Sequence, residues 1–123
     1  MEFRIPRATR AALQIFLFLF VPAVPVAAMA ETPTGVTLTL QNHRFTPSAL
    51  TVPAGQKLHV TLINDDPAME EFDSDDLVVE EDVTPKGRTG FDIGPLAPGE
   101  YHFMGEFHAK TAQGKIIAVP MAH

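Results

Sequence analysis

Hydrophobic and polar residues alternate along much of the chain after residue 35. Apolar residues occupy every second position in 36–40 and again in 58–62, which is typical of strands with one buried face. Shorter apolar runs of the same kind lie at 50–52, 91–93, 101–103 and 115–119. Turns rich in Pro and Gly separate these runs. The pattern predicts an all-β domain folded as a small β-sandwich.

Two segments depart from simple alternation. Residues 74–83 leave a short helix open, although their aspartates and β-branched valines are poor helix formers. Residues 116–119 read Ile-Ile-Ala-Val without a polar residue between them. An unbroken apolar run of this length predicts a last strand that is buried on both faces.

The first thirty residues have a different pattern from the rest of the chain. Three arginines in the first ten residues precede an apolar run at 11–28, and Ala-Met-Ala then ends at Ala30. This order predicts a secretory signal peptide cleaved after Ala30. An uncleaved membrane anchor is the alternative, but two prolines interrupt the run. We therefore expect a signal peptide at 1–30 and one periplasmic domain at 31–123.

The charge of the chain limits the classes of partner. The whole chain has 9 basic and 15 acidic residues, for a net charge of −6. Without the three arginines and one glutamate of the predicted leader, the net charge becomes −8. Nucleic acids are therefore not expected as partners, whereas cations and basic proteins are favoured. The acidic stretch 70–82, which includes Glu80 and Glu81, is predicted to be a solvated face or a rim that attracts them.

Three stretches, at 45–65, 69–74 and 95–119, together resemble the cupredoxins. The matching motifs are F-x-P from residue 45, P-x-G from residue 53, Asn64, and G-E-Y-x-F from residue 99. The resemblance covers most of the chain after the leader. It implies a cupredoxin-like Greek-key β-sandwich.

The resemblance also implies where metal ligands would lie. Blue-copper members of the family hold copper with a His, then with Cys, His and Met in the last loop. Here Glu70 stands at the first His, Gly105 at the Cys and His108 at the second His, and Ala-Gln precedes Gly114 where the Met is expected. One ligand of four remains and the chain has no Cys. A blue-copper electron carrier is not expected, because its redox behaviour depends on a copper–thiolate bond.

The pairing of GEFHAKTAQG with EEFDS resembles a narrower group, the FtrB-like periplasmic component of bacterial ferrous-iron uptake systems. A related cupredoxin domain is found in EfeO-type proteins. The resemblance implies iron or copper as the metal, ferroxidase-like oxidation of Fe(II), and two partners. These partners are a ferroxidase-type iron permease in the membrane and a second periplasmic iron-binding protein.

The ligand from the EEFDS segment remains open between two neighbours. The EfeO-type resemblance implies Glu71, which we favour, whereas strand alternation favours Glu70 because it would share the face of Phe72. Glu106 and His108 complete a set of oxygen and nitrogen donors suited to iron, manganese or Cu(II). Met69 and Met104 offer thioether sulfur, which suits Cu(I).

Three hypotheses follow from these residues. The first is a protein that binds and helps to oxidise ferrous iron for import, with Glu71 or Glu70, Glu106 and His108 as ligands. The second is a copper-binding or copper-delivering module that uses Met69, Met104 and His108. The third is a metal-free docking domain that uses its acidic face.

The remaining histidines are predicted to be structural. His59 and His102 lie between inward-facing residues, so we expect both to face solvent. His43 is predicted to be a surface-loop residue, although the resemblance implies that it lies near the metal end of the sandwich.

Overall fold

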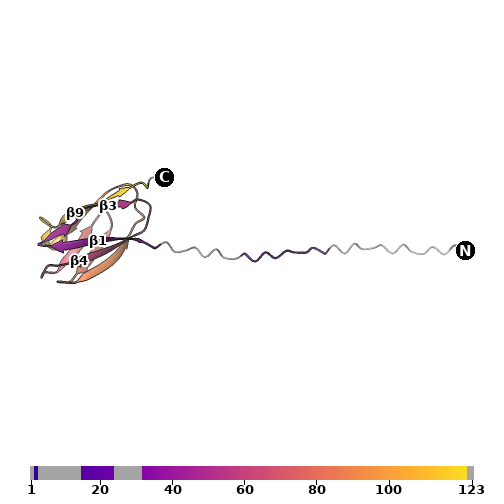
Figure 1. The fold of residues 1–123 in the computed structure, drawn as a ribbon, viewed down its shortest axis with the longest axis horizontal. Coiled ribbons are helices and arrows are strands. Elements are labelled where there is room, and N and C mark those ends of the chain that lie inside the picture. Colours follow the sequence, from indigo (N-terminus) through magenta and orange to yellow (C-terminus); the bar gives the residue numbers. More distant parts are fainter. Residues whose placement is uncertain (1, 3–14, 24–31, 122–123) are drawn as a thin grey trace.

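The computed structural model describes residues 2, 15–23 and 32–121 (Figure 1). The charged start of the predicted leader and its cleavage site at Ala30 lie outside these residues. Within the described residues, no helix is long and apolar enough to cross a membrane. All strands of the described part lie between Thr34 and Val119.

The strands form two sheets that face each other. The first sheet has the order β2-β1-β4-β7 and the second has the order β3-β9-β8-β5-β6. Figure 1 labels β1 and β4 of the first sheet and β3 and β9 of the second. The first sheet consists of β1 (Thr34–Gln41), β2 (Arg44–Thr46), β4 (Leu58–Asn64) and β7 (Arg88–Ile93). The second consists of β3 (Ala49–Pro53), β5 (Glu70–Ser74), β6 (Val79–Val83), β8 (Gly99–Gly105) and β9 (Gln113–Val119).

The pairing within the sheets is mixed. β1 runs parallel to β4, and β3 runs parallel to β9. The other neighbours are antiparallel, including the β5–β6 hairpin and the β8–β9 pair. One short 3₁₀ helix, η1 (Glu106–His108), follows β8. The predicted all-β sandwich is confirmed.

The core lies between the inward faces of the two sheets. Leu38, Leu58 and Val60 from the first sheet are fully buried, as are Phe72 and Ile116 from the second. Burial of one such side chain stabilises the fold by about 1.5–3 kcal/mol. The rings of Phe45, Phe72 and Phe103 contact one another with centroid distances of 4.9–6.1 Å. Within this group Phe72 lies opposite Gly105, where β5 pairs with the end of β8.

Two elements differ from what the sequence left open or predicted. The helix that was left open at 74–83 does not form, because a turn follows Ser74 of β5 and leads into β6, and every residue of β6 pairs with β5. The last strand is buried on one face only, because Ile116 and Ala118 are buried whereas Val119 is 39% exposed. In both cases neighbouring strands decide the structure, which local sequence does not record.

Candidate metal centre

The loop between β4 and β5 is held by Asn64, the last residue of β4. Its Nδ2 donates hydrogen bonds to the carbonyl oxygens of Ala68 at 2.8 Å and Thr84 at 3.1 Å. Its Oδ1 accepts the N–H of Asp66 at 3.0 Å. A buried amide costs free energy unless its groups are bonded. These bonds therefore fix where the loop places Asp66 and the start of β5.

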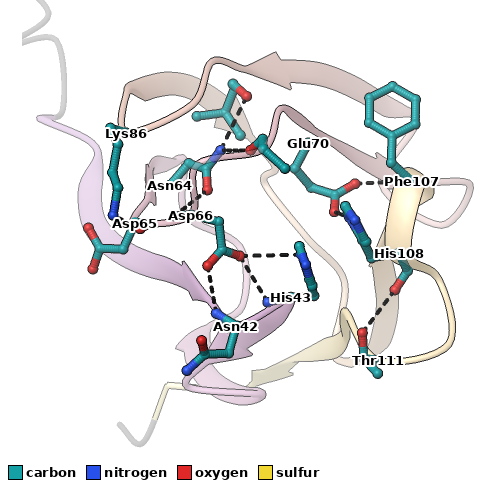
Figure 2. Close-up of polar contacts among 12 residues, drawn as sticks. Asn42, His43, Asn64, Asp65, Asp66, Glu70, Lys86, Phe107, His108 and Thr111 are labelled. Atoms are coloured by element: carbon teal, nitrogen blue, oxygen red, sulfur yellow. Dashed lines mark hydrogen bonds and ion pairs between the residues drawn. The ribbon is translucent and has the colours of Figure 1, made fainter.

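Glu70, the first residue of β5, has a buried carboxylate with only 1% of the residue exposed. Its Oε1 accepts the backbone N–H of Glu71 at 3.1 Å and that of Phe107 at 2.9 Å. Its Oε2 lies 2.6 Å from Nδ1 of His108, and Figure 2 shows the two side chains pointing toward each other. A buried carboxylate is tolerated when both oxygens have partners. Strand alternation placed Glu70 correctly on the face of Phe72, which is also buried.

The space for this carboxylate exists because residue 105 has no side chain. Gly105 lies opposite Phe72 in the β5–β8 pair. A Cβ atom at residue 105 would lie 2.6 Å from Cδ of Glu70 and 2.8 Å from Cβ of Ala112. Real Cβ atoms do not approach other atoms this closely. The Glu70 carboxylate therefore fills the space that a cysteine at position 105 would need.

The short helix η1 positions His108. The carbonyl oxygen of His108 accepts the N–H of Thr111 at 3.1 Å and of Ala112 at 2.9 Å, and the N–H of Gly105 donates to the carbonyl of Ala112 at 2.8 Å. These bonds close the loop after β8 at its base. The His108 side chain is 29% exposed, so one edge of the ring reaches solvent while Nδ1 faces Glu70.

A second imidazole comes from the β1–β2 turn. Its two central residues, Asn42 and His43, both have positive φ, at 53° and 56°. Asp66 accepts the N–H of Asn42 at 2.7 Å and the N–H of His43 at 2.8 Å (Figure 2). Burial raises the pKa of Asp66, but these backbone hydrogen bonds outweigh it, and the pKa is lowered. Asp66 therefore holds the turn as an anion.

His43 lies flat against His108. The ring centroids are 3.7 Å apart and the rings are 12° from parallel. Nδ1 of His43 is 3.5 Å from Oδ2 of Asp66, but it is buried from solvent and makes no hydrogen bond with the described residues. The prediction of a surface-loop histidine is confirmed, because His43 lies in the β1–β2 turn and its side chain is 42% exposed. What the sequence did not predict is that its ring stacks on that of His108.

The other two predicted carboxylate ligands are Glu71 in β5 and Glu106 in η1. Glu71 alternates outward from Glu70, opposite Asp82 in the β5–β6 pair. Burial raises the pKa of Glu71, and the carboxylates of Glu106, Asp82 and Glu80 raise it further. Glu71 and Glu106 are therefore neighbours, but neither takes part in the hydrogen bond between Glu70 and His108.

Both methionines among the candidate ligands are exposed. Met104 is 41% exposed and lies opposite Asp73 of β5. It lines a surface hollow of about 330 Å³ together with Asp73 and His102. Met69, which precedes Glu70, is 42% exposed. The structure therefore does not bring Met104 and His108 together around one point.

His59 and His102 face solvent, as predicted, with side chains 47% and 67% exposed. His59 bonds Asp92 at 2.7 Å, and this bond is the main reason that the pKa of Asp92 is lowered. His102 lies 3.8 Å from Glu100. Neither histidine takes part in the Glu70–His108 pair.

These residues fit some metal ions and not others. A blue-copper centre does not fit, because Gly105 supplies no thiolate and Glu70 fills its place. A carboxylate, an imidazole and a buried imidazole nitrogen without a hydrogen bond fit a hard or borderline divalent ion. Two ligands of one such ion lie about 3–3.4 Å apart. Binding at Glu70 and His108 therefore requires their 2.6 Å contact to open by less than an ångström.

In the described part of the chain, no three His, Asp or Glu side chains already stand as a complete metal-binding group. A hollow of about 460 Å³, lined by residues 107–111, lies beside His108. It gives the exposed edge of that ring an open approach from solvent.

Solved structures with the same fold include several copper proteins. Auracyanin A, a "blue" copper protein from Chloroflexus aurantiacus, has a TM-score of 0.64 at 14% identity, covering 72% of this chain and 100% of that chain. The metal-binding domain of the Cu(I)-exporting P-type ATPase CopA from Streptococcus pneumoniae D39 has a TM-score of 0.61 at 14% identity, covering 69% and 84%. A purple cupredoxin from Nitrosopumilus maritimus has a TM-score of 0.56 at 18% identity, covering 68% and 99%. At these identities the likeness concerns the fold.

Sequence comparisons identify the family. The uncharacterized protein RP394 of Rickettsia prowazekii (strain Madrid E) is 40% identical over 82 residues, which cover 67% of this chain and 66% of that protein. The family model of the cupredoxin-like domain matches residues 10–118. The chain therefore belongs to the cupredoxin-like domain family.

Proposed function

We propose that this protein is a periplasmic metal-binding protein that takes up ferrous iron at Glu70 and His108 and supports its oxidation for import. The observation that supports it is the buried Glu70 carboxylate, which lies 2.6 Å from His108 Nδ1 in the space left by Gly105. Where blue-copper relatives need a soft thiolate, this chain offers a hard oxygen donor. Its partners would be a ferroxidase-type iron permease in the membrane and a second periplasmic iron-binding protein.

The ligands of the proposed site explain why it would favour oxidation of Fe(II) to Fe(III). Carboxylate oxygen and imidazole nitrogen are hard and borderline ligands. A negative oxygen ligand stabilises Fe(III) more than Fe(II), so the site would make the loss of one electron easier. That electron has to pass to an acceptor, either dioxygen or a metal of the partner. The chain itself would bind the ion and set its redox preference.

The acidic outer face supports the capture of a cation. Glu71, Glu106, Glu80 and Asp82 lie close enough that their charges raise the pKa of Glu71. A surface with one sign of charge raises the local concentration of ions of the opposite sign. We propose that these carboxylates attract Fe(II) toward the inward pair. The sequence had suggested Glu71 and Glu106 as ligands of the metal itself and Glu80 as part of an acidic rim.

Anaerobic titration of the chain from Glu31 with Fe(II), followed by admission of oxygen, tests this function. That chain contains every strand of the described fold. We expect one equivalent to bind and to oxidise faster than free Fe(II). Glu70→Gln and His108→Ala should each abolish binding, whereas the control His102→Ala, on an exposed histidine, should leave it unchanged. Unchanged binding in both site variants would rule out this site.

Copper delivery is the second candidate function. It is favoured by the exposed thioethers of Met69 and Met104, which are 42% and 41% exposed, and by the fold shared with the Cu(I)-binding domain of CopA. Competition between Cu(I) and Fe(II) distinguishes the two functions. Preferential Cu(I) binding that is lost in Met69→Leu or Met104→Leu would favour copper. Binding of neither metal would leave the metal-free docking domain.

A further inference from the structure

The β1–β2 turn has a residue that its backbone does not favour. A two-residue hairpin turn with positive φ at both positions is most often Asn-Gly, because Gly adopts positive φ without a steric cost. Here the second position is His43, at φ 56°. Asp66 holds this backbone through the N–H groups of Asn42 and His43. When a chain breaks a local rule and stabilises the result, the residue concerned is a candidate for function.

The position of the His43 side chain indicates what that function is. Its ring covers the ring of His108 at 3.7 Å, directly beside the Glu70–His108 pair. Its Nδ1 is buried and has no hydrogen bond within the described residues. Buried polar atoms normally have partners, and an exception calls for a reason such as an ion that binds there. Stacking alone would be served equally well by an aromatic ring without nitrogen.

We propose that His43 is a third metal-binding side chain of the Glu70–His108 site. This inference rests on the proposed function and deepens it, because it extends the donor set to one carboxylate and two imidazoles. That set matches the 2-His-1-carboxylate arrangement that suits Fe(II) and leaves coordination positions open. The groups that face His43 are Asp66 from the β4–β5 loop and His108 from the loop after β8.

Binding through both imidazoles requires a modest movement. The ring nitrogens bind metal in the plane of each ring, and the two planes are only 12° from parallel. One ring therefore has to tilt. His43 is the freer of the two, since its side chain is 42% exposed and that of His108 is 29% exposed and hydrogen-bonded to Glu70. The metal would thus open the stack and draw His43 inward.

Titration with Cu(II), a spectroscopic probe for this donor set, tests the inference. Electron paramagnetic resonance counts the imidazole nitrogens bound to Cu(II), and we expect two in the native protein. His43→Phe keeps an aromatic ring but has no donor nitrogen. It should leave one bound imidazole and weaken both Cu(II) and Fe(II) binding by roughly 10- to 100-fold, the range typical of residues that support a metal site. His59→Phe, at a solvent-facing histidine on β4, is the matched control and should leave two.

A second variant protects the test against misfolding. His43→Asn keeps a residue that tolerates positive φ, so the turn should form, and it should give the same loss of one imidazole as His43→Phe. If both variants bind metal as the native protein does, with two imidazoles still bound, the inference is wrong while the Glu70–His108 site stands. If the native protein binds neither Fe(II) nor Cu(II), the inference and the proposed function both fail.

Discussion

At the scale of single residues, Glu70 and Gly105 depend on each other. A Cβ atom at residue 105 would lie 2.6 Å from Cδ of Glu70, and the carboxylate is held in place by three hydrogen bonds. The carboxylate cannot move without losing these partners. A side chain at residue 105 and the buried carboxylate of Glu70 therefore exclude each other.

Gly105→Ala should lower the free energy of unfolding by about 1–3 kcal/mol, as overpacking of a buried site typically does. Urea unfolding of the metal-free protein measures this. In the Glu70→Ala background the contact with the carboxylate is gone and only the contact with Cβ of Ala112 remains, so Gly105→Ala should cost about 1 kcal/mol less there than in the native protein. If the effects of Gly105→Ala and Glu70→Ala on the free energy of unfolding are additive, the proposed contact between the added methyl group and the carboxylate is wrong. Gly35→Ala, at a site with nothing within 4 Å of an added Cβ, is the control.

Asp66 gives a prediction for pH dependence. Its pKa is lowered by backbone hydrogen bonds despite burial, so its contribution to stability is present above its unfolded pKa of 3.8 and is lost as the pH falls through the lower folded value. Asp66→Asn should therefore cost about 2 kcal/mol at pH 7 in chelator, from weaker charge-assisted bonds. The difference should shrink steadily below about pH 4. A difference that stays constant between pH 7 and pH 3 would contradict it.

The sequence predicted part of this site. Alternation from Phe72 correctly placed Glu70 inside, and the loop pattern singled out His108. The contact between His43 and His108 was missed because it joins two turns that are 65 residues apart and is set by Asp66 from a third loop. The sequence does contain one signal of this contact. The two-residue turn Asn42-His43 ends in His, where Gly is usual.

At the scale of elements, the β5–β6 hairpin shows how tertiary structure overrides local preference. Glu71 pairs with Asp82, and Asp73 pairs with Glu80. Like charges directly opposite each other are unfavourable in a sheet, and acidic residues have low strand propensity. The inward residues Phe72 and Val83 are 0% and 1% exposed and compensate through burial. The sequence pattern cannot weigh these two effects, so it decides neither for nor against a helix at residues 74–83.

The turn of this hairpin contains a residue whose replacement should stabilise the fold. Val78 is 89% exposed and has φ 56°, a conformation that is unfavourable for a β-branched side chain. Val78→Gly should therefore raise the free energy of unfolding by about 0.5–1 kcal/mol, because relief of the left-handed conformation exceeds the entropy that Gly adds to the unfolded chain. Val119→Gly, in strand β9, is the control and should destabilise. A loss of stability in Val78→Gly would contradict the strained conformation.

At the scale of the whole molecule, the fold was predictable because most strands alternate with one buried face. The period-two pattern requires a second layer to cover each sheet, and the two sheets provide it. What the pattern could not give is the strand order, since the parallel pairs β1–β4 and β3–β9 join segments that are distant in sequence. The core between the sheets consists of apolar side chains, with the Glu70–His108 pair at one end.

Because the core is apolar and the site residues bond one another, the fold should not need metal. Glu70 has partners for both oxygens without an ion. We therefore expect the midpoint of urea unfolding to be the same in buffer and in excess chelator, unlike a domain that folds around its metal. Bound metal should then add stability by mass action, about 2.7 kcal/mol at a free concentration one hundred times the Kd. In His108→Ala, chelator should likewise leave the midpoint unchanged, but added metal should not stabilise the protein. Unfolding by chelator alone would mean that the metal is part of the fold, and the buried carboxylate would then be a ligand that the native state cannot leave unbound.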